Sequence, residues 1–500
     1  MKSQSFISGV IFQYGAVLSL YLSSFIFYFI VAHILPTYLV GVISLLLAIL
    51  NIFYTVFALG LGTGMQHFIS YHLARNNINT IRRIIKDTSL IGILLSAAAF
   101  LFTYFSSSYI STIFFHSIKY SFYIKIIGIG ISGDVLMNIF SSMLLGLNYY
   151  RAFSITNIIT NISGYFIPLS LFLITKDFEY FIFGFSLSYA FYASIYISMV
   201  IIFYFRLVDG NNEDERYLNV LKYSIPVFIS GIFGTGANYM DRIIVSYFVN
   251  LSYLGIYNFA IVITSAVLFL LIPVFNIILP RLSYIFSVND ESGFKTSLRL
   301  LLNFSYILYV PAAFGISALS RYILFLFAGP MYLKAAVPMT IILISTSLFS
   351  GSYVFSNALS STKRTRIFII SSGLAMLANI ILSFLLIPVY GITGAAISYS
   401  SMNGTNFIIL YYFARNFVKY DLKIIFKIFA SSIFMSIILF YLGTMLSYGF
   451  INLFILIILG ALIYAMEIKI FKIISREDGI LISSLIGNIK VFRFILKILS

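Results

Sequence analysis

The stretch from Tyr239 to Ile263, YMDRIIVSYFVNLSYLGIYNFAIVI, decides the fold class. Two apolar runs are separated by a short break at Asn250 to Tyr253, and the first run carries the adjacent charges Asp241 and Arg242. That run belongs to a segment long enough to cross a bilayer. A charge near the membrane centre costs about 2.5–3.5 kcal/mol on insertion scales, so such side chains tend to face a cavity or a partner. The pattern predicts membrane helices, one of which carries charged side chains that face a cavity or a partner.

The composition of the rest of the chain agrees with this prediction. Of its 500 residues, 61% are hydrophobic and 9% are charged, whereas soluble domains carry about 25% charged residues. Apolar runs of about 20 residues recur from end to end. We therefore expect an all-α polytopic membrane protein with about fourteen transmembrane helices. The expected spans are 6–31, 38–65, 88–108, 120–145, 152–174, 180–205, 221–249, 254–280, 297–319, 334–360, 366–388, 392–414, 424–446 and 450–468.

The positive charges predict the orientation of these helices. The formal net charge is +16, and the bases lie in breaks between apolar runs, which indicates membrane topology and anionic lipid headgroups rather than nucleic acid. With the N-terminus inside, 25 of the 31 Lys and Arg residues fall on the cytoplasmic side, which predicts a multi-pass cell-membrane protein with both termini cytoplasmic. Five bases fall outside, namely Lys119, Lys125, Lys176, Arg321 and Lys334.

The sequence offers little for covalent or metal chemistry. It has no Cys and four His without metal-ligand spacing, so disulfides and Cys-ligated metals are excluded. We expect no cofactor apart from a possible H⁺ or Na⁺ coupling ion. The apolar run after Lys2 exceeds the roughly 7–15 residues of a cleavable signal core, which favours a retained first helix.

Two halves of the chain resemble each other. Tyr38 to Val42 matches Tyr253 to Tyr257, and Ser188-Tyr189 matches Ser398-Tyr399, in the same order and at a nearly constant offset. Two six-helix repeats in the same membrane orientation are a transporter plan with a cavity between the halves. We therefore predict an N-terminal six-helix bundle at 1–205, a cytoplasmic linker at 206–220, a C-terminal six-helix bundle at 221–414, two further helices at 415–470 and an amphipathic cytoplasmic tail at 471–500.

The candidate substrate-binding residues centre on Arg242. Its guanidinium suits phosphate oxygens, and Asn238 and Thr235 precede it by four and seven residues, on the same helical face. The alternative is that Arg242 pairs with an acid or extends to the membrane surface. Further polar candidates inside apolar helices are Asn138, Asn51 and Asn258, although such side chains are often packing hydrogen bonds.

Two acids are candidates for ion coupling. Asp241 borders the face of Asn238, and Asp134 begins a polar stripe with Asn138 and Ser142. Intramembrane acids often carry protons or ions in transporters. The alternatives are a structural ion pair for Asp241 and a helix contact for Asp134.

Six stretches together carry a resemblance to a known family. They are LPTYLVGVISL (Leu35 to Leu45), LGLGTGMQHFISYHLARNN (Leu59 to Asn77), MDRIIVSYF (Met240 to Phe248), YLGIYNFA (Tyr253 to Ala260), ILPRLSYIF (Ile278 to Phe286) and IPVYGITGAAIS (Ile387 to Ser398). In this order they resemble the polysaccharide and lipid-linked oligosaccharide flippases of the multidrug/oligosaccharidyl-lipid/polysaccharide exporter superfamily. The resemblance implies a fourteen-helix fold with two six-helix bundles and alternating-access movement of a polyprenyl-(pyro)phosphate-linked oligosaccharide to the outer leaflet, for polysaccharide or glycoprotein glycan assembly. Many relatives carry bases in the first helix, where this chain has none after Lys2. We expect a monomeric transport unit.

Two other functions compete with this interpretation. A cation-coupled multidrug exporter of the same superfamily would share the fold, but the basic inner loops favour an anionic lipid-linked substrate. A polytopic glycosyltransferase or ligase would need acids or bases in sizeable outer loops, whereas the outer breaks here are short and their only clear acids are Asp177 and Glu179. The sequence therefore favours a transporter over an enzyme.

Overall fold

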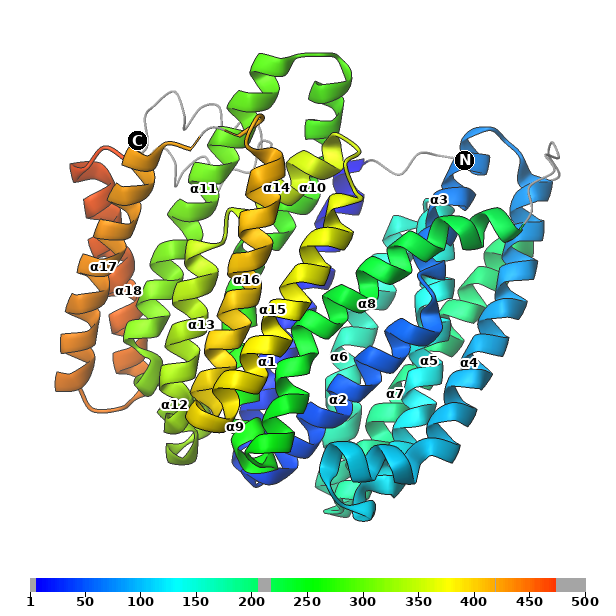
Figure 1. Ribbon diagram of the computed structural model, residues 1–500, viewed down its shortest axis with the longest axis horizontal. Coiled ribbons are helices and arrows are strands. Elements are labelled where there is room, and N and C mark those ends of the chain that lie inside the picture. The colour runs from blue at the N-terminus through cyan, green and yellow to red at the C-terminus, as the bar shows by residue number, and fades with distance from the viewer. Residues whose placement is uncertain (1–5, 206–216, 419, 474–500) are drawn as a thin grey trace. The chain divides into compact units, whose positions relative to one another are not determined.

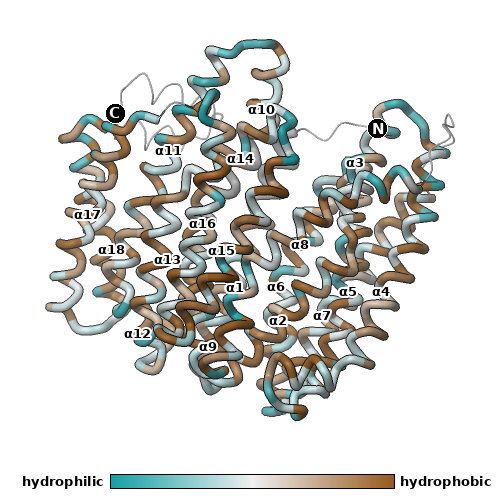
Figure 2. The backbone as a smooth tube through the Cα atoms, in the orientation of Figure 1, coloured by the Kyte–Doolittle hydropathy of each residue, from teal (hydrophilic) through white to brown (hydrophobic). Residues whose placement is uncertain are grey.

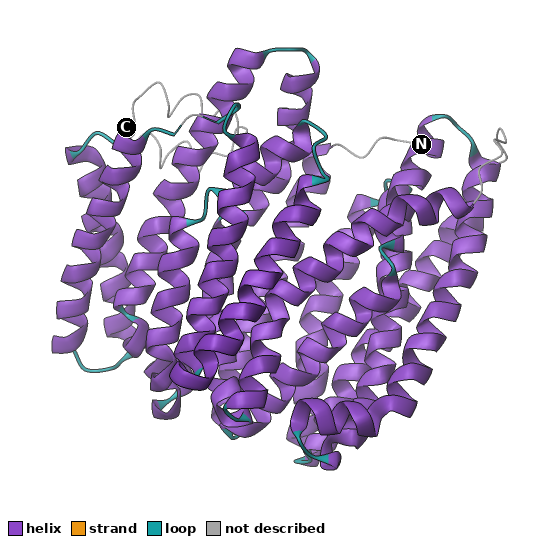
Figure 3. Ribbon diagram, in the orientation of Figure 1, coloured by secondary structure: helices purple, strands orange, loops and turns teal. Residues whose placement is uncertain are grey.

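The computed structural model describes residues 6–205, 217–418 and 420–473. Within these ranges the chain forms α-helices, three short 3₁₀ helices and loops, without a strand (Figure 3). Twelve of the described helices are long and apolar enough to cross a membrane. Apolar residues fill the middle of the helices and hydrophilic residues gather in the connections (Figure 2). The all-α polytopic fold is confirmed, while most of the predicted linker and tail lies outside the described residues.

The chain divides into two compact units, made of the described residues of Met1–Val31 with Tyr38–Leu254, and of Ala32–Thr37 with Gly255–Ser500. The six-helix domain boundaries stay a sequence-based prediction. Figure 1 labels the helices of both units. The first unit consists mainly of α1 (Phe6–Ile34), α2 (Thr37–Ala58), α3 (Leu61–Ala74), α4 (Ile78–Phe115), η1 (Ile118–Tyr120), α5 (Ser121–Gly146), α6 (Tyr150–Thr175), α7 (Phe178–Phe205) and α8 (Tyr217–Phe248).

The second unit contains the remaining helices and ends with a pair that follows the predicted repeats. In sequence it contains α9 (Leu251–Val267), η2 (Leu268–Leu270), α10 (Ile272–Ser287), α11 (Glu291–Ala318), α12 (Ser320–Ala328), η3 (Pro330–Ala335), α13 (Ala336–Leu348), α14 (Ser352–Ser361), α15 (Ile367–Tyr390), α16 (Ile392–Ala414), α17 (Leu422–Met445) and α18 (Phe450–Ile470). Its most extensive helix contacts are those of α15 with α16 and of α11 with α17.

Three of the expected spans are interrupted rather than continuous. The span 38–65 breaks between α2 and α3, 254–280 breaks at η2, and 334–360 breaks between α13 and α14. At the first break Gly60 has φ 67°, and a Cβ there would lie 2.8 Å from the backbone oxygen of Ser224 on α8. Glycine is therefore required both by the left-handed backbone and by the close approach of α8.

The difference between about fourteen expected spans and twelve apolar helices has a simple cause. The interruption leaves α9 with 17 residues, fewer than the roughly 20 that a spanning helix needs. The α16 helix has 23 residues, but its stretch SYSSMNGTN lowers the mean hydropathy. Helices nevertheless occupy every range in which a span was expected.

Close packing of α5 against α7 fixes the middle of the first unit. A Cβ added at Gly133 would lie 2.7 Å from the backbone carbon of Tyr189, so only glycine allows the two backbones to approach so closely. A Cβ at Gly62 would likewise lie 2.3 Å from Oδ1 of Asn138. These two contacts bring α3, α5 and α7 together around Asp134, which directly follows Gly133.

Candidate functional site

Two helices of the first unit, α2 and α8, face each other through small and hydroxyl-bearing residues. Oγ1 of Thr55 lies 3.0 Å from Oγ1 of Thr235, and Thr55 also donates to the backbone oxygen of Asn51 at 2.8 Å. A Cβ at Gly231 would lie 3.6 Å from the methyl carbon of Thr55. The glycine-rich segment of α8 thus brings the predicted residue Thr235 into direct contact with α2.

The two asparagines on these helices bind their own backbones. Nδ2 of Asn51 donates to the oxygen of Leu47 at 2.8 Å, and Nδ2 of Asn238 donates to the oxygen of Gly234 at 2.8 Å. Asn238 is exposed and Asn51 is half-buried. Each amide uses one donor within its helix, which leaves its carbonyl oxygen and second N–H available to a polar molecule.

The adjacent charges on α8 lie in different environments. Arg242 is half-buried, and its guanidinium carbon lies 4.6 Å from the centre of the Tyr239 ring. Asp241 is 0% exposed, and its Oδ1 accepts the backbone N–H of Arg242 at 2.9 Å. Consecutive helical residues point about 100° apart, so the two side chains face different surroundings.

Asp134 on α5 is surrounded by tyrosines from two other helices. It is 8% exposed and is the charged neighbour of the hydroxyl groups of Tyr54 on α2 and Tyr189 on α7. The Tyr54 hydroxyl forms a hydrogen bond with the side chain of Asn138, one turn after Asp134 on α5. The predicted polar stripe of α5 therefore lies inside the first unit, against α2 and α7.

Further tyrosines lie near this carboxyl group. The hydroxyl of Tyr189 has those of Tyr165 on α6 and Tyr239 on α8 among its electrostatic neighbours, together with Asp134. Tyr165 is hydrogen-bonded to Ser24 of α1. Tyr239 in turn lies against the guanidinium of Arg242. We call the tyrosines from α2, α6, α7 and α8 the tyrosine cluster: Tyr54, Tyr165, Tyr189 and Tyr239.

Seven of the eight residues predicted from the sequence lie in the first unit, and Asn258 lies in the second. Thr235, Asn238, Asp241 and Arg242 share α8, with Asn51 on the facing α2, and Asp134 and Asn138 share α5. Asn258 belongs to the second unit, where it is 2% exposed and its Nδ2 has no hydrogen-bond partner among the described residues. The tyrosines were the missed members, and of them only Tyr239 carried a signal, because it precedes Arg242 by one helical turn.

The chemistry available here is binding and proton exchange. A guanidinium can hold phosphate oxygens, tyrosine hydroxyls can donate and accept hydrogen bonds, and an enclosed carboxyl group can exchange a proton. Among the described residues, no three His, Cys, Asp or Glu side chains lie together in a way that could hold a metal ion.

Comparison with protein families confirms the class that the motifs suggested. The model of a family described as "Polysaccharide biosynthesis protein" matches residues 6–286, which is more than half of the chain. The chain belongs to this family. The matched range contains every candidate residue named above, from Asn51 to Asn258.

One curated relative and two solved structures illustrate the similarity. The "Probable low-salt glycan biosynthesis flippase Agl15" of Haloferax volcanii is 26% identical over 249 residues, which are 49% of this chain and 52% of that protein. The chain thus matches about half the length of this relative.

The structural similarity covers most of the chain. A structure of "Lipid II flippase MurJ, inward closed conformation" has a TM-score of 0.75 and 20% identity, and the match covers 92% of this chain and 98% of that one. An inward-facing multidrug resistance transporter of the MATE family, in the MOP superfamily, has a TM-score of 0.67 and 12% identity, with 80% and 94% covered. At these identities the similarity concerns the fold.

Proposed function

We propose that the protein is a membrane transporter that moves a polyprenyl-(pyro)phosphate-linked oligosaccharide from the cytoplasmic to the outer leaflet by alternating access. The family membership and the fold shared with flippases support this function. No covalent bond has to be made or broken in such a step. The protein therefore needs affinity for a phosphate, affinity for sugars and a change of access, rather than a catalytic group.

The observation that carries the proposal is the environment of Arg242. A half-buried guanidinium lies within a helix long and apolar enough to span the membrane, stacked on Tyr239. The guanidinium group carries its N–H donors in a fixed fork that matches phosphate oxygens, so the phosphate of a lipid carrier is a ligand that suits Arg242.

The surroundings of Arg242 suit the sugar part of the substrate. Thr235, Asn238 and Asn51 offer hydroxyl and amide groups on α8 and the facing α2. Sugars present many hydroxyl groups together with apolar C–H faces, so they favour sites that combine polar donors with aromatic rings. We assign the glycan to this surface and the lipid phosphate to Arg242.

The proposal assigns ion coupling to the acids. Asp134 is 8% exposed, and protonation or a bound cation would relieve the cost of burying its charge. We propose that it exchanges H⁺ or Na⁺ during the transport cycle. Asp241, which already accepts the N–H of Arg242, is the second candidate.

The topology belongs to the same proposal. We place the protein in the cell membrane with both termini cytoplasmic, because the bases then follow the positive-inside rule. The transport unit is proposed to be one chain, with the lipid-linked glycan as its partner within the bilayer.

A second function, cation-coupled export of drugs or toxic compounds, is favoured by one observation. The buried Asp134 resembles an ion-coupling group that could serve an exporter equally well, and the fold is shared with multidrug transporters. A drug exporter does not require a phosphate ligand for Arg242. The two functions therefore differ in their demand for this cation.

Loss of the protein distinguishes the two functions. In cells that lack the chain we expect lipid-linked oligosaccharide to accumulate in the inner leaflet, where it is inaccessible to externally added glycan-modifying enzymes, and drug sensitivity to stay unchanged. Re-expression of the chain should restore access. Normal glycan display together with increased drug retention would contradict the flippase and support the exporter.

A further inference from the structure

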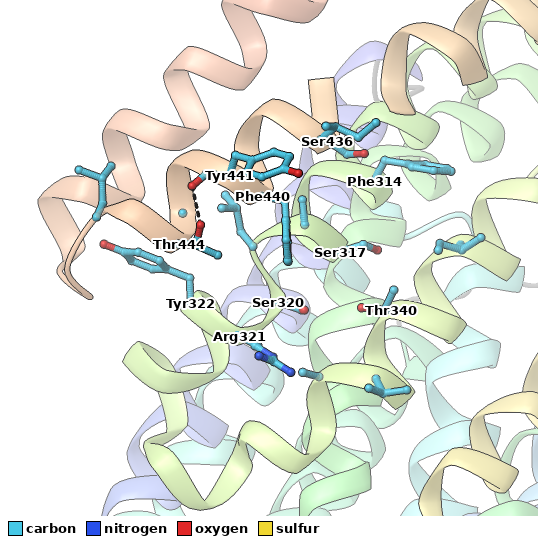
Figure 4. A pocket seen from close by; sticks show the side chains of 18 of the residues that line it. Phe314, Ser317, Ser320, Arg321, Tyr322, Thr340, Ser436, Phe440, Tyr441 and Thr444 are labelled. Atoms are coloured by element: carbon cyan, nitrogen blue, oxygen red, sulfur yellow. Dashed lines mark hydrogen bonds between the residues drawn. The ribbon is translucent and has the colours of Figure 1, made fainter. Parts of the chain in front are cut away.

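The second unit contains a cavity that the proposed transport cycle does not use. It has a volume of about 990 Å³ and lies between the end of α11, the start of α12, α13 and the second half of α17. Figure 4 shows Arg321 and Thr340 on one side of this space and Phe440 and Tyr441 of α17 across from them. The volume is at the upper end of the roughly 300–1,000 Å³ range of small-molecule pockets.

The wall of the cavity is apolar and open to the surroundings of the helices. Val337 on α13 is 55% exposed, and Ile437 and Phe440 on α17 are 50% and 52% exposed. These residues lie on helices apolar enough to span a membrane, so in a bilayer this face meets lipid chains rather than water. An apolar occupant of the cavity would come from the membrane.

One end of the cavity is positively charged. Arg321 is exposed, and it is the single charged side chain among the residues that line the cavity, all of which are described. It lies just beyond the end of α11, at the edge of the apolar span Glu291–Ala318. A guanidinium just beyond the end of an apolar span, beside an apolar wall and without a carboxylate in the lining, is complementary to a phosphate headgroup.

The rim beside Arg321 is held in place by neighbouring groups. The hydroxyl of Tyr322 donates to the oxygen of Ser447 and accepts the backbone N–H of Gly449 at 3.0 Å. Tyr448 stacks on Phe325 with ring centres 4.5 Å apart. These contacts tie the connection between α17 and α18 to α12, so the cavity is formed before any ligand enters and little ordering cost remains.

The cavity fits within the depth of one leaflet of the membrane. Along α17 the lining extends from Ser436 to Thr444, a rise of about 12 Å at 1.5 Å per residue. Half of the hydrocarbon core of a bilayer measures about 15 Å. A lipid with its phosphate at Arg321 would therefore place its chains along the full length of the wall.

We propose that this cavity is a binding site for an anionic phospholipid of the surrounding leaflet. The lipid phosphate binds Arg321, the acyl chains lie against Val337, Ile437 and Phe440, and the hydroxyl of Thr340 is available to the glycerol ester region. The lipid acts as a bound component of the second unit, fills the seam between α13 and α17, and is distinct from the transported substrate. The inference does not depend on the transport function.

The test measures lipid binding to the purified full-length protein by native mass spectrometry in mild detergent. Phosphatidylglycerol is the probe and phosphatidylcholine the comparison. We expect one phosphatidylglycerol to bind with about tenfold preference over phosphatidylcholine, because charge-assisted hydrogen bonds favour the anionic headgroup. Arg321→Gln should remove this preference, and Arg321→Lys should keep part of it.

A second variant examines the apolar part of the site without changing charge. Thr340→Phe places a ring into the cavity and should reduce binding of both lipids, whereas Lys119→Gln, a cation of the first unit, should leave binding as in the wild type. Inorganic phosphate at millimolar concentration should not displace the lipid, since it lacks the chains. Equal binding of both lipids to the wild type, unchanged binding in Arg321→Gln and Thr340→Phe, or displacement by phosphate alone would overturn the proposal.

Discussion

The helices α1 and α8 occupy corresponding places in the sequence repeat, but α1 carries aromatic residues where α8 carries charged ones. The repeat aligns Phe27 and Tyr28 of α1 with Asp241 and Arg242 of α8. Phe27 and Asp241 are both 0% exposed. The ring of Phe27 lies 5.2 Å from that of Tyr28 and 5.1 Å from that of Tyr165, while Asp241 accepts the N–H of its neighbour.

This difference separates residues that stabilise the fold from residues that cost stability. Burial of an aromatic ring is favourable in itself, and ring contacts add about 0.5–1.5 kcal/mol. Burial of a carboxyl group is unfavourable unless hydrogen bonds or charges compensate. The α1 position is therefore explained by packing, and the α8 position is the one that the proposed function uses. Tyr165 lies near both positions, because its ring contacts Phe27 and the hydroxyl of Tyr239 on α8 is among its electrostatic neighbours.

The largest expected effect is on the free energy of unfolding, and it comes from substitution of the aromatic residue Phe27 on α1. Phe27→Ala should lower the free energy of unfolding by about 3–5 kcal/mol, because it leaves a cavity among packed rings. Chemical unfolding of the purified protein would measure the change. Asp241→Asn, which keeps the shape and one acceptor, should cost clearly less. If the asparagine variant were the less stable of the two, the assignment of α1 to packing and α8 to function would be wrong.

The next effect is on function and comes from Arg242. Arg242→Ala should lower the apparent affinity for a lipid-linked glycan about 100-fold, since hydrogen bonds to charged groups contribute about 1.5–3 kcal/mol. Arg242→Lys should recover part of the affinity. Lys125→Ala is the matched control, because this cation also stacks on a tyrosine, with its Nζ 5.1 Å from the ring centre of Tyr104. A similar loss of affinity in Lys125→Ala would contradict a specific role of Arg242, because removal of another cation of the first unit would then have the same effect.

A smaller effect is expected at Asp134. Asp134→Asn keeps the size of the side chain but cannot exchange a proton, so stimulation of transport by an ion gradient should fall about tenfold, which is about 1.4 kcal/mol. Substrate binding without a gradient should stay within a factor of two to three of the wild type. Transport under proton and sodium gradients would be compared in proteoliposomes. Full gradient stimulation in the variant would exclude Asp134 from coupling.

The smallest expected effect is the coupling free energy between Thr55 on α2 and Thr235 on α8. The coupling free energy between Thr55→Val and Thr235→Val in a double-mutant cycle should be about 0.6 kcal/mol, the average for hydrogen bonds between membrane helices. Unfolding of the single and double variants gives this quantity. A coupling near zero would indicate that the hydroxyl groups, 3.0 Å apart, prefer other partners in the membrane.

The sequence predicts the membrane class and the helix ranges because hydropathy is a local property. Each expected span is occupied by helix, and the family predicted from the motifs is the family that matches. The interruption at Gly60 could not be predicted, because it depends on the approach of Ser224 from a distant helix. The breaks that shorten α9 and divide α13 from α14 are likewise set by tertiary packing.

The candidate site was predictable only in part for the same reason. Charges in apolar runs identify Asp134, Asp241 and Arg242 without any structure, since their cost in a membrane makes them conspicuous. Tyr54 and Tyr189 have no such signal in a chain with 38 tyrosines. The proximity of Tyr189 to Asp134 follows from the contact of Gly133 with α7, and that of Tyr54 from the packing of α2, which is distant in sequence from α5. Asn258 looked equivalent to Asn51 in sequence, yet it belongs to the other unit.

The central claim is that Arg242 binds the phosphate of a lipid-linked glycan that the protein carries across the membrane. The most direct measurement is transbilayer movement of a fluorescent polyprenyl-pyrophosphate oligosaccharide in proteoliposomes that contain the wild type, Arg242→Ala or Lys125→Ala. We predict movement with the wild type and with Lys125→Ala. Movement with Arg242→Ala should be about 100-fold slower, because hydrogen bonds to a charged group contribute about 1.5–3 kcal/mol. Equal rates for all three proteins, or no movement with the wild type, would contradict the claim.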